Sequence, residues 1–183
     1  PFGRGLVAAV LVLMLIVSAL FVWRLRPGLR EFVRERRSHL IAGEVVFLAL
    51  FLVFLLIRMG NPDLWHPAMG GEKPMDFAYF NAVIRTQFFP SYDPWFAGGQ
   101  LNYYYYGFVL GAIMVLMTGI EPATAYNLMV PLFFALTGLG AFAVTYNLVA
   151  RGGWGRSAIE RRPGWAPVLF GAVGAAFVVV AGN

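Results

Sequence analysis

Long apolar runs separated by short polar segments dominate the chain. Five of these runs approach the ~20 residues that a helix needs to cross a hydrocarbon layer of ~30 Å. Because a helix satisfies its own backbone hydrogen bonds in lipid, the pattern predicts an all-α fold, a polytopic transmembrane helical bundle with about five spans. One membrane domain covering 1–183 is the simplest organisation. The expected spans are about 5–23, 40–57, 103–119, 123–150 and 166–181.

Three of the runs contain residues that bear on helix packing. Glu44 lies about one turn inside the second run, and we expect its carboxylate at the membrane interface. Gly107 and Gly111 in the third run have the four-residue spacing that lets another helix approach closely. Pro131 predicts a bend in the fourth run, which is long enough to tilt.

The composition agrees with a membrane protein. Hydrophobic residues make up 60% of the chain and charged residues 13%, against roughly 45–50% and about 25% in soluble domains. The absence of cysteine excludes disulfides, thiolate metal ligands and a cysteine nucleophile. The net charge of +5 comes mainly from arginines beside the apolar runs, so we expect membrane lipid rather than nucleic acid as the partner. The chain begins without methionine and ends just after an apolar run, and we expect it to be part of a longer protein.

Basic residues in short loops predict the orientation in the plasma (cell) membrane. Six arginines lie in the segment 24–38, which is therefore expected to be a cytoplasmic loop. Counting spans then places the loop 59–102 on the extracytoplasmic side, where acidic residues outnumber basic ones. The same count places 151–165 outside although it holds four arginines, and this conflict leaves the side of that segment open.

The loop 59–102 concentrates the residues that can carry chemistry, since loops on rigid scaffolds are where function gathers. Phe77, Phe80, Ile84 and Phe88 recur every three or four residues and predict a short amphipathic helix on the membrane surface. Asp76 would lie at its N-terminal end, where the helix dipole favours a carboxylate.

Each acidic residue of this loop also has a structural explanation. Asp76 can cap the predicted helix, Glu72 can be a solvated charge after the Gly-Gly turn, and Asp93 can form an Asx turn ahead of Pro94. His66 lies beside aromatic residues and is more often a packing residue than a ligand. Three acids on one loop can nevertheless bind a divalent cation and supply a general base. The sequence has no HExxH motif, nucleophile elbow, P-loop or dinucleotide-binding glycine motif.

Four consecutive tyrosines, Tyr103, Tyr104, Tyr105 and Tyr106, precede the third run. An interfacial aromatic belt explains one or two of them. Successive helical residues project about 100° apart, so the others would present hydroxyls and ring faces to the loop or to a ligand. Such groups suit the recognition of sugars and phosphates.

The segment GGEKPMDFAYFNAVIRTQFFPSYDPWFAGGQLNYYYYG closely resembles the YYY-domain integral membrane proteins, a family named for its tyrosine run. The resemblance covers roughly 59–150 and includes the EKPMD block, the DPW turn before Ala-Gly-Gly, and the tyrosines. This family in turn is similar to the C-type (GT-C) glycosyltransferases, multi-span enzymes that use polyprenyl-phosphate-linked sugars and an acidic residue in a large extracytoplasmic loop.

The resemblance implies roles for individual residues. Asp76 looks like the catalytic loop acid, with Glu72 as the neighbouring candidate, and Asp93 looks like a second acid that could hold a divalent cation (Mg or Mn) together with Asp76. Lys73 and Arg85 are the cations that would steady the lipid phosphate. Substrate binding would also involve Asn102 and the four tyrosines.

The leading hypothesis is therefore a membrane glycosyltransferase that transfers a sugar from a polyprenyl-phosphate donor. A transporter or flippase for a lipid-linked or polyol substrate is the main alternative, and a structural subunit of a membrane complex is the third. The tyrosine run stands where many C-type enzymes carry a proline-containing motif, so the donor sugar and the acceptor stay open.

Overall fold

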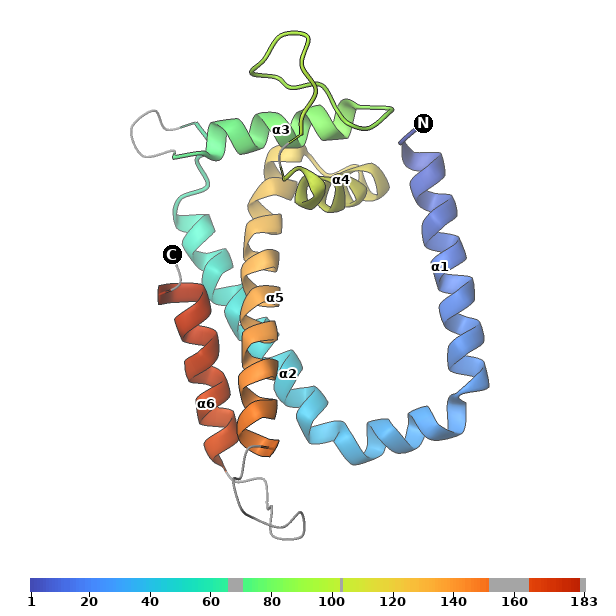
Figure 1. Ribbon diagram of the computed structural model, residues 1–183, viewed down its shortest axis with the longest axis vertical. Coiled ribbons are helices and arrows are strands. Elements are labelled where there is room, and N and C mark those ends of the chain that lie inside the picture. Colours follow the sequence, from blue (N-terminus) through green and yellow to red (C-terminus); the bar gives the residue numbers. More distant parts are fainter. Residues whose placement is uncertain (66–70, 103, 152–164, 182–183) are drawn as a thin grey trace. The chain divides into compact units, whose positions relative to one another are not determined.

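The computed structural model of the chain describes residues 1–65, 71–102, 104–151 and 165–181 (Figure 1). Within these ranges the chain is helical apart from its loops and one isolated antiparallel bridge between Tyr92 and Gln100. The predicted all-α class is confirmed for this part of the chain. The helices are α1 (Arg4–Arg24), α2 (Arg26–Gly60), α3 (Lys73–Arg85), α4 (Tyr106–Thr118), α5 (Pro122–Arg151) and α6 (Trp165–Ala176), followed by the short π-helix η2 (Phe177–Ala181).

Three helices, α1, α2 and α5, are long and apolar enough to cross a membrane. They correspond to the predicted spans 5–23, 40–57 and 123–150. The other two predicted spans form shorter apolar helices, the 13-residue α4 and the segment Ala166–Ala181. The described part of the chain thus has three helices long enough to be spans, and the five expected spans are not confirmed. Pro131 lies inside the continuous helix α5.

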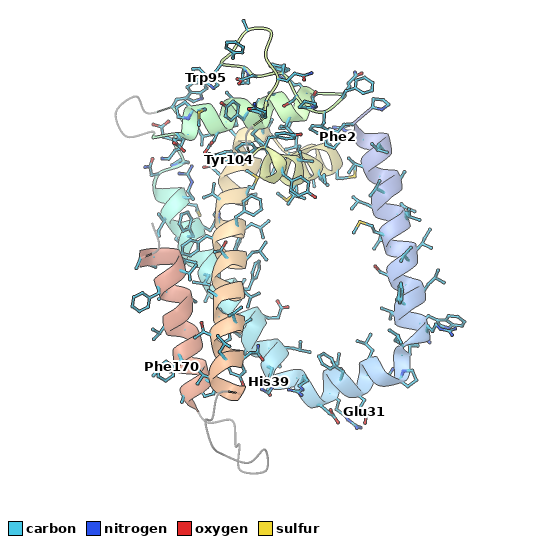
Figure 2. All side chains as sticks on the ribbon, viewed as in Figure 1. Phe2, Glu31, His39, Trp95, Tyr104 and Phe170 are labelled. Atoms are coloured by element: carbon cyan, nitrogen blue, oxygen red, sulfur yellow. The ribbon has the colours of Figure 1, made fainter. Side chains whose placement is uncertain are left out.

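The arginine-rich segment differs from the prediction, because it is helical and not a loop. Leu25 alone separates α1 from α2, and α2 then runs for 35 residues, or roughly 52 Å at 1.5 Å per residue. Its charged first part includes Glu31, which lies near the α1 end of the helix (Figure 2). Pro27 is the second residue of α2, a position that tolerates the missing N–H of proline.

The chain divides into two compact units, and the first comprises 1–35 and 60–129. Its core forms where α3 packs on α4 and on the start of α5. Phe80 is fully buried, with its ring centroid 6.4 Å from that of Phe108 and 6.1 Å from that of Tyr126. Most side chains of α1 are exposed, including Leu15 at 68%, which suits a helix surrounded by lipid.

The second unit comprises 36–59 and 130–183, and its described part holds the remainder of α2 and α5 together with α6 and η2. Phe54 of α2 packs against Phe134 of α5, with ring centroids 4.4 Å apart. Helix α6 approaches α5 through glycine: a Cβ at Gly171 would lie 2.8 Å from the ring of Phe142. Small residues therefore allow close helix contacts in this unit, as is common in membranes.

Candidate functional site

Helix α3 is the element that positions the proposed catalytic acid. It begins at Lys73, after Gly71 has turned the chain with a φ of 57°, a backbone conformation that favours glycine. Pro74 occupies the first turn, where its missing N–H costs nothing. Asp76 lies in the same turn, at the N-terminal end of a helix as expected, whereas Phe88, expected on the same helix, lies beyond its last residue, Arg85.

The carboxylate of Asp76 lies in a mixed polar and apolar environment. Its Oδ2 accepts a long hydrogen bond of 3.4 Å from the hydroxyl of Tyr126, while its buried Oδ1 has no hydrogen-bond partner among the residues that the structure describes. Burial raises the pKa of Asp76 above its ordinary value, and the nearby charge of Glu72 raises it further. The hydrogen bond from Tyr126 opposes this shift.

Asp76 is therefore not a simple capping residue. Glu72 occupies the N-cap position of α3, and no side chain makes a capping hydrogen bond there. The helix begins immediately after Glu72. Glu72 itself is exposed, as expected for a solvated charge, and acts on Asp76 through its negative potential.

The aromatic core beneath α3 holds Asp76 in place. Phe77 packs edge-on against Tyr126, with ring centroids 5.8 Å apart, and Phe80 one turn later contacts the same tyrosine. A Cβ at Gly111 of α4 would clash with Met129 Sδ and lie 2.9 Å from Phe80 Cε2. The lack of a side chain at Gly111 thus lets α3 sit close to α4, as the glycine spacing suggested.

A short hairpin-like loop carries the second acid. The backbone N–H of Leu101 donates to the carbonyl of Ser91 at 2.8 Å, and that of Asp93 donates to Gly99 at 3.0 Å. Asp93 Oδ1 accepts the N–H of Trp95 at 2.8 Å, so the predicted Asx turn is confirmed. Trp95 lies in the loop beyond α3 (Figure 2). Ser91 is buried at the base of the loop, and its Oγ also lacks a hydrogen-bond partner among the described residues.

Tyr79 links the two acids electrostatically. Burial raises the pKa of its phenol, and the charges of Asp93 and then Asp76 raise it further. Negative charge near a phenol disfavours its ionised form. Asp76 and Tyr79 are three residues apart and share a face of α3.

The two predicted cations occupy opposite ends of α3. Lys73 begins the helix and lies within one turn of Asp76, whereas Arg85 ends it. Twelve residues separate them, which corresponds to roughly 18 Å along the axis. Lys73 is the cation nearer to Asp76 along the helix, and Arg85 is exposed at the far end.

The tyrosine run leads into α4. Tyr105 is the N-cap residue, and its ring stacks on Phe89 with centroids 5.8 Å apart and planes 9° apart. Tyr106 and Tyr104 are exposed, at 71% and 53%, and Tyr104 lies near the start of α4 (Figure 2). Asn102 is also exposed. Tyr103 and His66 lie outside the described residues.

A divalent cation would have few protein ligands here. In the described ranges, no three His, Asp or Glu side chains are grouped closely enough to hold a metal ion. Mg²⁺ often binds through only one or two carboxylates, with water and substrate phosphate oxygens as its other ligands. A site that used Asp76 and Asp93 would therefore need water and phosphate oxygens to complete the coordination of the metal ion.

Tyr126 and Tyr79 lie near Asp76 but were not among the site residues predicted from the sequence. Tyr126 is separated from Asp76 by fifty residues and lies in a run predicted as a span, so no local pattern connects them. Tyr79 could have been found, because its three-residue spacing from Asp76 places both on one helical face.

Comparison with known proteins identifies the family. Residues 1–183 match the family described as Uncharacterized membrane protein (DUF2298), and the chain belongs to this family. No curated protein and no solved structure matches the chain. The membrane location expected from the apolar runs agrees with the family.

Proposed function

We propose that this member of the DUF2298 family is a membrane glycosyltransferase of the C type (GT-C), and that Asp76 is its general base. The observation that carries the proposal is the half-buried carboxylate with a raised pKa, whose buried Oδ1 has no hydrogen-bond partner in the described part of the chain. Buried polar atoms in native proteins are almost always hydrogen-bonded, so an exception calls for a ligand or water. The hydroxyl of a sugar acceptor is a suitable donor for this oxygen.

The reaction is a displacement at the anomeric carbon of a polyprenyl-phosphate-linked sugar. The acceptor hydroxyl oxygen bonds to that carbon while its proton moves to Asp76. The bond from the carbon to the phosphate oxygen breaks, and the electron pair leaves with the lipid phosphate. A carboxylate with a raised pKa is a better proton acceptor than a free aspartate, and Glu72 contributes to that shift.

The leaving phosphate requires positive charge nearby. Lys73 is within one helical turn of Asp76 and is the cation assigned to the phosphate. Asp76 and Asp93 are the candidates for holding Mg²⁺ or Mn²⁺, which when bound would neutralise negative charge on the phosphate. Arg85, Asn102 and the tyrosines would contact more distant parts of donor and acceptor.

The orientation of the chain supports access to such a donor. The six arginines between 24 and 38 favour the cytoplasmic side for the start of α2, and the loop 59–102 would then lie on the extracytoplasmic face of the plasma membrane. The site would then face lipid-linked sugars in the outer leaflet.

The experiment compares Asp76→Asn with Asp63→Asn in the full-length protein reconstituted in nanodiscs. Asp63 is an exposed acid of the same loop whose Oδ1 accepts the N–H of Trp65 at 2.8 Å, and asparagine preserves that bond. Transfer is measured from a panel of undecaprenyl- and decaprenyl-phosphate sugars with tritiated sugar, with and without Mg²⁺. General base catalysis typically contributes about 10²–10⁴-fold, so Asp76→Asn should lose that much activity while Asp63→Asn keeps it. Undiminished transfer by Asp76→Asn would contradict the proposal.

A further inference from the structure

The relative direction of helices α2 and α5 limits how many times the segment that connects them can cross the membrane. In the second unit the ring of Phe54 packs on Phe134, and that of His39 packs on Tyr146 with centroids 5.8 Å apart. Later residues of α2 thus pair with earlier residues of α5, so the two helices are antiparallel. Within this unit, Met59 of α2 and Val130 of α5 therefore lie at the same end of the pair.

The first unit leads to the same conclusion independently. Asn127, in the second turn of α5, donates from Nδ2 to the carbonyl of Pro62 at 3.2 Å. Pro62 follows the last residue of α2 by two positions. The connection from 61 to 121 therefore begins and ends on one side of the membrane, and it must cross an even number of times. Its described part contains a single apolar helix, α4, so the even number is zero.

The dimensions and neighbours of α4 agree with this count. Its 13 residues extend over roughly 20 Å, short of the ~30 Å hydrocarbon layer. At its N-terminal end Tyr105 stacks on Phe89, which packs on Phe2 with centroids 5.0 Å apart. At its C-terminal end a Cβ on Gly119 would lie 3.9 Å from Nη2 of Arg4. The C-terminal end of α4 thus lies beside the start of α1, and its N-terminal end is linked to Phe2 through the ring of Phe89. Figure 1 shows α4 running across the direction of α1.

The two faces of α4 differ in what they contact. Phe108, Ala112 and Val115 are buried in the first unit, while Leu110 and Met117, two turns apart, are 43% and 38% exposed. In a membrane protein whose adjacent helix α1 is exposed along most of its length, the natural cover for this apolar stripe is lipid.

We propose that α4 is embedded in the extracytoplasmic half of the bilayer and returns to that side without crossing, with Leu110 and Met117 against the acyl chains of the outer leaflet. Helix α5 is then the return crossing, and it ends on the cytoplasmic side. The arginines at 151, 156, 161 and 162 join the six between 24 and 38 on that side. The positive-inside pattern, which a fully crossing α4 contradicts, is restored. This topology holds whether or not Asp76 is catalytic.

Cysteine labelling tests the topology directly, because none of the 183 residues is cysteine. Thr118→Cys marks the C-terminal end of α4 and Ser157→Cys marks the segment after α5. Gln100→Cys in the loop and Ser38→Cys in α2 are the references for the two sides. Each is made in the full-length protein without other cysteines and exposed in whole cells to a membrane-impermeant maleimide, before and after permeabilisation.

Thr118→Cys should react in intact cells as Gln100→Cys does, and Ser157→Cys should react only after permeabilisation, as Ser38→Cys does. A crossing α4 gives the opposite result at both positions, and that result would overturn the proposal. If Thr118→Cys is unreactive in both conditions, Ser157→Cys decides alone, because its labelling in intact cells excludes the proposed topology.

Nitroxide labels test the contact with lipid. In nanodiscs, labels on Leu110→Cys and Met117→Cys should collide more with oxygen than with a water-soluble nickel complex, at depths confined to one leaflet. A label on Tyr106→Cys, at the exposed start of the helix, should favour the nickel complex. Greater nickel accessibility at positions 110 and 117, or a label at the bilayer centre, would contradict the embedded position.

Discussion

The close contact between α3 and α4 at Gly111 offers a direct test of the packing that holds the candidate site. A Cβ at this position would clash with Met129 Sδ and lie 2.9 Å from Phe80 Cε2. The thioether of Met129 can move, but Phe80 is fully buried between Phe108 and Tyr126 and has little room to do so. Gly111→Ala is therefore expected to separate the helices slightly and to destabilise the first unit.

Gly140 in α5 is the matched control, because a Cβ there meets nothing within 4 Å. Alanine is favoured over glycine inside a helix by about 0.8–1.0 kcal/mol, and this gain applies at both positions. At Gly111 it is opposed by overpacking, which typically costs about 1–3 kcal/mol. The net effect of Gly111→Ala is thus between about zero and 2 kcal/mol of lost stability, and the two variants should differ by about 1–3 kcal/mol.

Thermal stability of the purified full-length protein measures this difference. Each sample is heated in detergent, and the fraction that remains monodisperse is followed by fluorescence-detected size exclusion. At about 2–4 °C per kcal/mol, Gly111→Ala should melt roughly 2–12 °C below Gly140→Ala. If Gly111→Ala melts at or above the temperature of Gly140→Ala, the close packing of α3 on α4 described here is wrong.

Two further predictions concern the titration of Asp76. Its pKa is raised in the folded protein above the ordinary value of 3.8, so the folded state holds this proton more tightly than the unfolded state does. The resulting contribution to stability is complete below the unfolded pKa and is lost as the pH rises through the folded pKa. The melting temperature of the unmodified protein relative to Asp76→Asn should therefore fall as the pH is raised from about 4 to about 8, and a pH-independent difference would contradict this. Tyr126→Phe removes the hydrogen bond that lowers the pKa of Asp76, so the pH-dependent fall in melting temperature should move to higher pH. An unchanged midpoint of this fall would show that the 3.4 Å contact has no electrostatic effect.

The apolar runs of the sequence identify every described long helix, but hydropathy alone misplaces the start of α2. The segment after Leu25 was expected to be a loop because it is densely charged. Charge marks a segment as exposed to water or headgroups, yet arginine and glutamate are good helix formers. Pro27 marks the first turn of the resulting helix rather than a break in it.

The length of α4 shows a second limit of hydropathy. The run 103–119 is nearly long enough to cross a membrane, but the helix begins only at Tyr106 and stops at Thr118. Gly119 ends it in a left-handed conformation with a φ of 72°. Turn geometry at both ends makes the helix about a quarter shorter than the apolar run 103–119, and hydropathy does not detect such turns.

The site was predictable where it depends on local sequence and not where it depends on packing. The position of Asp76 in the first turn of α3 and the Asx turn of Asp93 follow from residues within a few positions of each acid. The contact of Asp76 with Tyr126 depends on how α3 packs against the start of α5, and no spacing in the sequence indicates it.

The shallow position proposed for α4 has a consequence for the proposed chemistry. Helix α3 rests on α4 through Phe80, so the depth of α4 sets the height of Asp76 above the hydrocarbon layer. A helix confined to the outer half of the bilayer would hold α3 at the level of the lipid headgroups, which is where the phosphate of a polyprenyl donor must lie because its chain stays in the hydrocarbon. The absence of a side chain at Gly111 brings α3 nearer to that level, so the same contact that stabilises the first unit would also bring the carboxylate to the lipid phosphate.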